Sequence, residues 1–326
     1  MRGEFELIAR YFAPLAAGEA GALGLADDAA VVRPPADRDL VYTLDTIVAG
    51  VHYLPDDPPD LVARKLLRVN LSDLAAMGAR PRGYLLSTAL ARDAGEDWIA
   101  GFAEGLRADQ DTYGIGLLGG DTTAMPGPTT LSMTAIGEVP CGRALRRSGG
   151  RPGDALYVSG RIGDSALGLK VALGELAPDD PTDQAALMER YRLPQPRLGL
   201  GQALLERDLA RAALDVSDGL IADLGHLCSA SGTGAEITAA AVPLSAAAQR
   251  LVERDSDLLT TALTGGDDYE LAFAAVPENA DALAALAAAL DLPLTRIGRL
   301  TESGGVRVVD GQGGDLDLTR PGWTHF

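Results

Sequence analysis

The chain has 326 residues, 47% of them hydrophobic and 23% charged, which is enough for about two domains with real cores. Its net charge of -18 argues against nucleic acid as a partner, because the phosphate backbone requires a basic surface. Two cysteines and three histidines offer little material for disulfides, thiolate metal sites or histidine-based catalysis. No signal peptide or membrane-spanning run is recognisable, so a soluble cytoplasmic protein is expected.

Helical and strand-like segments alternate along the chain, which predicts an α/β fold of the α+β type. Helices are expected at residues 3–12, 58–77, 95–114, 164–173, 197–207 and 218–229. Strands are expected at 41–46, 83–91, 115–119, 129–139, 155–160, 213–217, 270–276, 294–300 and 305–309. The arginine- and glycine-rich stretch RALRRSGGRPGD then suggests a linker at 141–153, between domains at 1–140 and 154–326.

Asp73 is the one charged member of an apolar stripe on the predicted helix at 58–77, together with Val62, Leu66, Val69 and Met77. A buried, unpaired carboxylate is costly, so a metal ion, a cation or several donors should face it. The structural alternative is an aspartate at the edge of the stripe that pairs with an arginine.

Other acids lie in similar apolar or small-residue settings. Asp27 and Asp28 are adjacent like charges that a cation would explain, although for this pair taken alone a solvated turn is the favoured interpretation. Asp45 interrupts an apolar strand, where it is either a ligand or a turn-capping residue.

The phrase LLGGDTT places Asp121 after two glycines, at the expected end of a strand, where α/β proteins bind ligands. Its echo LTGGDD contains Asp267. In ALDVSDG, Asp215 and Ser217 should share one strand face, and Asp218 with Gly219 should open a helix; Ser217 as a plain N-cap is the structural alternative.

Taken together, these carboxylates and hydroxyls are the hard oxygen ligands that Mg²⁺ prefers. The chain has two lysines, Lys65 and Lys170, and neither lies in a P-loop or a kinase-type strand. Metal ions should therefore neutralise a phosphate substrate. Further positive charge can come from four arginines clustered within nine residues, unless these belong to a solvated linker: Arg143, Arg146, Arg147 and Arg151.

Eight phrases, in this order and over almost the whole chain, resemble the thiamine-monophosphate kinase family of the aminoimidazole ribonucleotide synthetase superfamily. They are GEFELIARYF, LADDAAVV, TLDTIVAGVHYL, VNLSDLAAMGA, LLGGDTT, GRALRRSGGRPGD, ALDVSDGLIADLGH and TGGDDYEL. The resemblance implies two α/β domains, an N-terminal sheet that pairs across a homodimer, and ATP with several Mg²⁺ ions bound in the cleft between the domains. It also implies phosphorylation of thiamine monophosphate.

The resemblance assigns roles residue by residue. Metal ligands would be Asp28, Thr43, Leu44, Asp45, Asp73, Asp121, Asp215 and Asp218. ATP contacts would be Gly120, Asp121, Arg147 and Ser217. The thiamine phosphate site would contain His52, Asp267 and Trp323.

Three positions depart from the family pattern. Ala26 replaces a glycine and makes its loop less free, Asp267 is one methylene shorter than the usual glutamate, and Trp323 stands where tyrosine is common. Two other hypotheses remain, namely another ATP-dependent enzyme of the superfamily and a non-catalytic Mg-nucleotide-binding protein. The chain lacks the terminal cysteines expected of selenophosphate synthetases and of the hydrogenase maturation factor, which favours the kinase.

Overall fold

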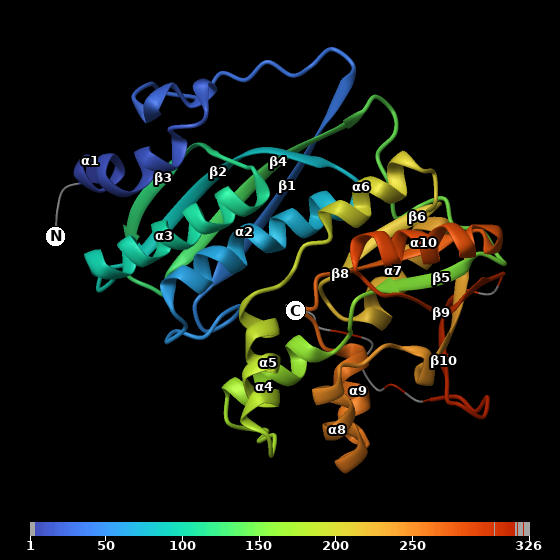
Figure 1. Ribbon diagram of the computed structural model, residues 1–326. Helices are drawn as coiled ribbons and strands as arrows, with labels where there is room; N and C mark the ends of the chain where they lie inside the picture. The colour runs from blue at the N-terminus through green and yellow to red at the C-terminus, as the bar shows by residue number, and fades with distance from the viewer. Residues whose placement is uncertain (1–3, 303, 317, 319–321, 323–326) are drawn as a thin grey trace. The chain divides into compact units, whose positions relative to one another are not determined.

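The computed structural model describes residues 4–302, 304–316, 318 and 322 (Figure 1). The chain divides into two compact units, residues 1–74 with 79–143 and residues 75–78 with 144–326. The domain boundaries stay a prediction from the sequence, with domains at 1–140 and 154–326 and a linker at 141–153. Within the described residues, no helix has the length and apolar character needed to cross a bilayer.

The first unit contains a four-stranded sheet in the order β1-β4-β2-β3. Its strands are β1 (Arg38–Val48), β2 (Arg80–Ala91), β3 (Leu117–Met125) and β4 (Thr130–Pro140). β4 runs antiparallel to β1 and β2, while β3 runs parallel to β2. A parallel neighbour needs a crossover, and the helix α3 (Glu96–Tyr113) supplies it, as the alternation in sequence predicted.

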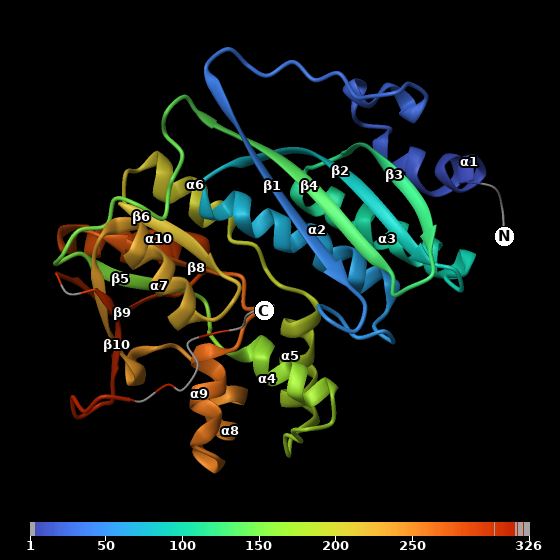
Figure 2. The same cartoon turned by 180° about the vertical axis from the view of Figure 1, so that it is seen from behind.

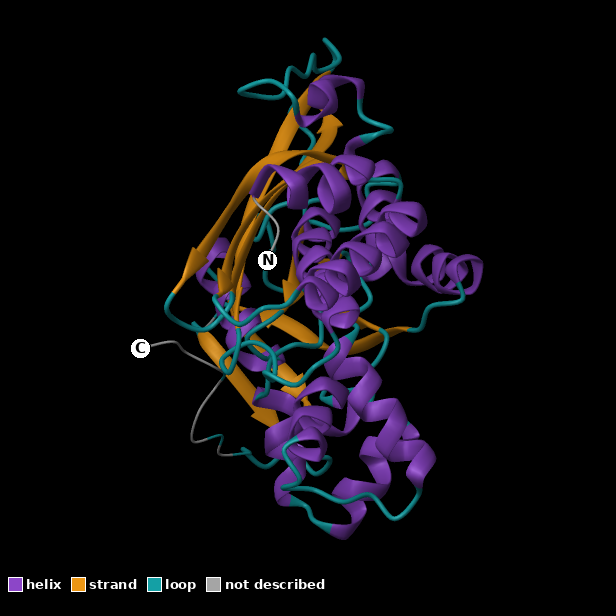
Figure 3. Cartoon of the chain, turned by 90° about the vertical axis from the view of Figure 1, so that its left-hand side faces the viewer, coloured by secondary structure: helices purple, strands orange, loops and turns teal. Residues whose placement is uncertain are grey.

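Two helices, α2 (Pro59–Ala76) and α3, cover one face of this sheet (Figures 1 and 3). Seen from behind, the four strands lie in front of them (Figure 2). Side-chain alternation along β4 matches this arrangement, because Leu131 and Met133 are fully buried while Ser132 between them is half-buried. The opposite face exposes large apolar side chains, including Tyr42 at 62% and Leu44 at 63%.

The N-terminal residues form short helical pieces. These are α1 (Glu4–Leu7), a π-helical turn at Ile8–Phe12 and 3₁₀ segments at Ala13–Ala16 and Ala20–Leu25. The helix predicted at 3–12 is thus helical over its described residues, but it changes its hydrogen-bonding pattern at Ile8.

The second unit is built on a six-stranded sheet in the order β10-β7-β9-β5-β8-β6. Its strands are β5 (Ala155–Ser159), β6 (Ala212–Val216), β7 (Gly234–Thr238), β8 (Glu270–Ala275), β9 (Leu294–Thr301) and β10 (Gly305–Val309). Its helices are α4 (Asp164–Ala172), α5 (Pro181–Arg192), α6 (Leu198–Glu206), α7 (Leu220–Ser231), α8 (Ala246–Arg254), α9 (Asp257–Thr264) and α10 (Ala280–Leu290), with 3₁₀ turns at Ala239–Ala241 and Pro277–Asn279. Strands β5 and β8 and the edge strand β6 are buried along their whole length, so their sequences are nearly continuous apolar runs.

A buried ion cluster ties helices to this sheet. Glu270 of β8 is fully buried and accepts hydrogen bonds from Arg190 at 3.0 Å, Arg197 at 2.6 Å and the hydroxyl of Ser159 at 2.6 Å. A buried carboxylate requires partners, and those of Glu270 come from three different segments. The cluster therefore joins α5, the segment before α6, and the strands β5 and β8.

Candidate functional site

Three of the predicted metal ligands meet on the helix-covered face of the first sheet. Thr43 and Asp45 come from β1, and Asp73 comes from α2. The hydroxyl of Thr43 donates to the Asp73 carboxylate, and the carboxyl groups of Asp45 and Asp73 are close enough to share a hydrogen bond. Asp73, the lone acid of its apolar stripe, therefore faces the oxygen-bearing side chains of Thr43 and Asp45. Asp45 lies within strand β1, which excludes the turn-capping alternative.

The environment of Asp45 opposes its negative charge. Burial, followed by the charge of Asp73 and their hydrogen bond, raises the pKa of Asp45 from 3.8 to about 7. Two carboxylates forced together in a half-buried position form a hard-oxygen pair that a divalent cation would satisfy. The donor set of Thr43, Asp45 and Asp73 therefore fits Mg²⁺.

Asp121 does not lie at the end of a strand, and this expectation was wrong. Strand β3 continues through both glycines to Met125, and Asp121 pairs with Ser87 in the middle of the ladder. Gly120 allows this, because a Cβ there would collide with the carbonyl oxygen of Leu86 on the neighbouring strand. The glycine accordingly serves close strand pairing.

The strand register separates Asp121 from the Thr43, Asp45 and Asp73 group. Asp45, Met133, Leu86 and Gly120 occupy one row of the sheet. Asp121 lies in the next row, which alternation directs to the other face. Within this chain, Asp121 and Asp45 therefore lie on opposite faces of the sheet, although the sequence suggested a single cluster of acids.

Asp121 instead lines a cavity of about 710 Å³ on the open face of the first unit, together with Asp27 and Asp28. Both of these acids are exposed, and the N–H of Asp28 donates to the Asp27 carboxylate at 2.9 Å. Ala26 causes no strain because its φ is -105°, and the left-handed positions are Leu23, Gly24 and Leu25. The departure at Ala26 is thus compatible with the loop.

In the second unit, Asp215 at 4% exposure lies within β6, and Ser217 and Asp218 follow the strand in a half-buried turn. The N-cap of α7 is Gly219, so the helix opens at the glycine of the predicted Asp218–Gly219 pair. Asp218 precedes the N-cap, and the alternative that Ser217 is the N-cap is wrong. Gly219 has φ 120°, and a Cβ there would collide with the Thr264 carbonyl. The turn is therefore held close to the end of α9.

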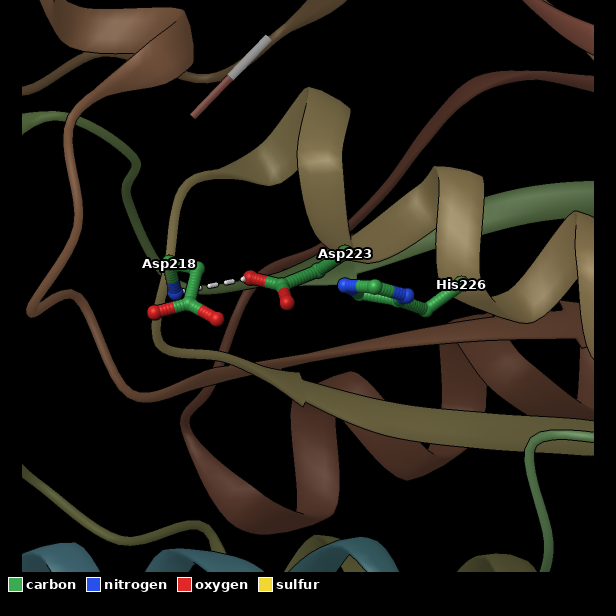
Figure 4. A group of neighbouring side chains, drawn as sticks. All are labelled: Asp218, Asp223 and His226. Atoms are coloured by element: carbon green, nitrogen blue, oxygen red, sulfur yellow. Dashed lines mark hydrogen bonds between the residues drawn. The ribbon is translucent and has the colours of Figure 1, made fainter. Parts of the chain in front are cut away.

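Asp223, which the sequence interpretation missed, organises this turn. It is 4% exposed, and its Oδ2 accepts the backbone N–H groups of Ser217 and Asp218, each at 3.0 Å. Figure 4 shows the hydrogen bond from Asp218. Burial raises the pKa of Asp223 to about 7, an effect that these two N–H groups and the Arg147 charge oppose. Asp223 is the one acid among the apolar residues Leu220, Leu224 and Leu227 of its helix. The same pattern singled out Asp73 on α2, so it could have identified Asp223 from the sequence as well.

Asp267 lies beside the same turn. Its N–H donates to the carbonyl oxygen of Ser217 at 2.8 Å, and the N–H of Tyr269 donates to that of Val216 at 2.8 Å. Asp267 has a left-handed φ of 74°. A Cβ on Gly266 would collide with the Ser217 carbonyl, so the glycines of LTGGDD permit close backbone approach.

The arginine stretch is fixed by its backbone while its side chains are exposed. The carbonyl oxygen of Arg146 accepts from Ala213 N–H at 2.9 Å, and that of Arg147 accepts from the Ser231 hydroxyl at 3.0 Å. Ser231 also accepts the N–H of Gly150 at 3.1 Å. Arg147 is thereby presented from a fixed turn, close enough to Asp223 to affect its pKa.

Of the residues predicted at the thiamine phosphate site, His52 and Asp267 lie in different units. His52 is half-buried in the first unit, and its Nδ1 accepts the backbone N–H of Val48 at 3.1 Å, which leaves Nε2 as the protonated nitrogen of the neutral ring. Trp323 lies outside the described residues. Leu44 exposes its side chain, so only its backbone carbonyl has the chemistry of a metal ligand.

Comparisons with known proteins agree with this architecture. Residues 26–139 match the family model "AIR synthase related protein, N-terminal domain", and residues 151–311 match the corresponding C-terminal domain. The thiamine-monophosphate kinase of Salmonella typhimurium (strain LT2) is 46% identical over 301 residues, covering 92% of this chain and 90% of that protein.

Solved structures give the same result. The crystal structure of thiamine-monophosphate kinase from Stenotrophomonas maltophilia K279a is 45% identical, with a TM-score of 0.85, 96% of this chain covered and 98% of the other. AaThiL complexed with AMPPCP and TMP is 32% identical, with a TM-score of 0.79, 100% of this chain covered and 99% of the other. The chain therefore belongs to the AIR synthase related proteins and, among them, to the thiamine-monophosphate kinase family.

Proposed function

We propose that the chain transfers the γ-phosphoryl group of ATP to thiamine monophosphate by one direct in-line step, giving ADP and thiamine diphosphate. The observation that carries the proposal is the likeness, over the full chain, to AaThiL complexed with AMPPCP and TMP. The kinases at 45–46% identity support the same reaction.

The acceptor chemistry explains why a general base is unnecessary. The nucleophile is a phosphate oxygen whose second pKa is about 6, so it is largely deprotonated at neutral pH. The main obstacle is repulsion between two anionic phosphates, and binding groups must overcome it by positioning and positive charge. A chain with three histidines and many carboxylates suits this reaction.

We propose that Mg²⁺ is held by the oxygen donors predicted from the sequence. On the first unit these are Asp28, Thr43, the Leu44 carbonyl, Asp45, Asp73 and Asp121; on the second they are Asp215 and Asp218. The paired carboxyl groups of Asp45 and Asp73 support this assignment, because their mutual repulsion disappears when a cation binds. Bound there, Mg²⁺ supplies the positive charge that phosphoryl transfer between anions requires.

The chain's own residues would orient the two substrates. ATP contacts are assigned to Gly120, Asp121, Arg147 and Ser217, and the thiamine phosphate site to His52, Asp267 and Trp323. The exposed guanidinium of Arg147 suits phosphate oxygens, and a protonated Nε2 makes His52 a hydrogen-bond donor. The hydrogen bond between Asp267 and Ser217 supports neighbouring sites for acceptor and nucleotide.

The proposed assembly is a homodimer in which the first sheet contacts its copy. Tyr42, Leu44 and Leu85 are exposed on the face that α2 and α3 leave open, and such an apolar patch is typical of an interface. Sedimentation of Tyr42→Asp should give monomers, while the matched surface variant Leu290→Asp should sediment like the wild type. The cytoplasmic location stays a prediction from the sequence.

The decisive assay measures ADP release with thiamine monophosphate, thiamine and aminoimidazole precursors, with and without Mg²⁺. Mg²⁺-dependent stimulation by thiamine monophosphate, with thiamine diphosphate as product, is expected. Stimulation by an aminoimidazole precursor would favour another reaction of the superfamily, and no stimulation by any acceptor would favour a binding protein.

A further inference from the structure

We propose that Asp223 is a positioning residue that holds the Ser217–Asp218 turn in the shape needed to bind MgATP. The inference rests on the proposed roles of Ser217 at ATP and of Asp218 at a metal ion. Asp223 itself need not touch either ligand. Its function follows from which donors its carboxylate accepts and from how firmly its own position is fixed.

The hydrogen bonds of Asp223 serve the turn, because they are directed away from the helix's own unsatisfied donors. The helix α7 begins at Leu220 after the N-cap Gly219, and its free N–H groups are those of its first turn. Asp223 instead accepts from Ser217 and Asp218, which both precede the N-cap. A simple helix-capping role would direct the carboxylate to residues 219–222.

Asp223 is well placed to hold a fixed geometry. Its N–H donates to the Gly219 carbonyl at 3.0 Å within the first turn of α7, and Leu220 and Leu224 anchor that turn in the core at 0% exposure. One oxygen, Oδ2, receives both donors at 3.0 Å. Two hydrogen bonds to one buried acceptor leave the turn little freedom.

The turn is restrained from its other side as well. The carbonyl oxygen of Ser217 accepts a hydrogen bond from the N–H of Asp267, and the N–H of Ser217 donates to the Asp223 carboxylate. Both polar groups of the Ser217 backbone are thus bonded to separate elements. If Asp223 moved, the Ser217 hydroxyl and the Asp218 carboxylate would move with the turn.

A direct metal-binding role for Asp223 is the alternative that the experiment must separate. Ligand atoms of Asp218, Asp223 and His226 lie within 4.8 Å of one another, and the Asp223 carboxylate lies between the other two side chains (Figure 4). Against a metal triad, two N–H donors already occupy Oδ2, and Arg147 contributes positive charge nearby. His226 is also exposed.

The test compares Asp223→Asn, which keeps an acceptor oxygen in place without the charge, with Asp223→Glu, which keeps the charge but moves it by one methylene. If Asp223 is a positioning residue, the KM of Asp223→Asn for MgATP should stay within about threefold of the wild-type value. The KM of Asp223→Glu for MgATP should rise at least about tenfold. The KM for thiamine monophosphate should change less. His226→Ala should match wild type.

Binding of MgAMPPCP by calorimetry and thermal unfolding without ligand complete the test in the full chain. An unchanged unfolding temperature with weakened MgAMPPCP binding in Asp223→Glu supports positioning; if that variant unfolds, Asp223→Ala supplies the same readout. The proposal is overturned if Asp223→Asn is as defective as Asp223→Glu, or if Asp223→Glu binds MgAMPPCP like wild type.

The design separates this inference from the proposed function. If wild type releases no ADP with thiamine monophosphate, the proposed reaction fails, while MgAMPPCP binding still tests Asp223. If Ser217→Ala and Asp218→Asn both bind MgAMPPCP normally, the turn is not part of the nucleotide site and the inference is overturned.

Discussion

The backbone N–H of Asp267 donates to the carbonyl oxygen of Ser217 at 2.8 Å, joining the two phrases LTGGDD and ALDVSDG. The absence of a side chain at Gly266 makes this approach possible. A residue assigned to the acceptor thus depends on the backbone of a residue assigned to ATP. The repeated glycine-acid phrase reflects a need for close backbone contact in both units, since Gly120 meets β2 in the same way.

Asp267→Asn should retain the fold, because asparagine tolerates the left-handed φ of 74° at this position. It should raise the KM for thiamine monophosphate about tenfold, since a charged partner of the substrate is lost. The KM for ATP should stay near the wild-type value. Steady-state kinetics with each substrate varied in turn would check this, and equal effects on both KM values would contradict the acceptor-site assignment.

Gly120→Ala and Gly119→Ala form a matched pair in β3. A Cβ on Gly120 would overlap the Leu86 carbonyl, while one on Gly119 would make an ordinary contact with Leu85 at 3.5 Å. Gly120→Ala should therefore lower the free energy of unfolding by at least about 2 kcal/mol, and Gly119→Ala by much less. Urea denaturation of both variants measures the difference; similar values would argue against tight β2–β3 pairing at Gly120.

Asp121→Asn should fold like the wild type, because Asp121 is exposed on strand β3. If it ligates a metal ion, turnover should fall at least about a hundredfold at saturating substrates. The unfolding temperature and the rate of ADP release would be measured on the same preparation. Turnover near that of the wild type would remove Asp121 from the metal site.

Glu270→Ala should be strongly destabilising, because it leaves Arg190 and Arg197 without their buried carboxylate. The expected loss is about 3–5 kcal/mol in the free energy of unfolding. Glu236→Ala is the control, since Glu236 forms surface ion pairs with Arg299 and Arg307 that are worth at most about 1 kcal/mol. Comparable losses in the two variants would contradict a structural role for the buried cluster.

Asp268 should make stability fall as pH rises. Burial raises its pKa well above the ordinary 3.8, while the N–H groups of Gly163 and Ser165 oppose the shift and the charges of Asp164 and Glu270 add to it. The folded state then binds the Asp268 proton more tightly than the unfolded state does. Its stabilisation is complete below about pH 4 and is lost as pH rises through the folded pKa.

Asp268→Asn removes this titration, so its stability should depend less on pH than that of the wild type. Urea denaturation between pH 5 and pH 8, without Mg²⁺, would compare the two slopes. Parallel curves for the two proteins would mean that Asp268 is ionised in the folded state throughout this range.

The sequence by itself determined the positions of the main elements. Apolar periodicity placed α2 and α3, and the buried strands β5, β6 and β8, within a few residues of their observed limits. It also singled out Asp73 as the lone acid of an apolar stripe. Local pattern suffices here because a helix or strand buries one face regardless of which distant segment covers it.

Only the tertiary structure decided where each acid points. Asp45 and Asp121 look alike in sequence, but the register of β1, β4, β2 and β3 directs them to opposite faces of one sheet. The hydrogen bonds that Asp223 accepts from Ser217 and Asp218 likewise depend on the backbone path around Gly219. Register and turn path are set by contacts between residues far apart in the chain, and local sequence does not encode them.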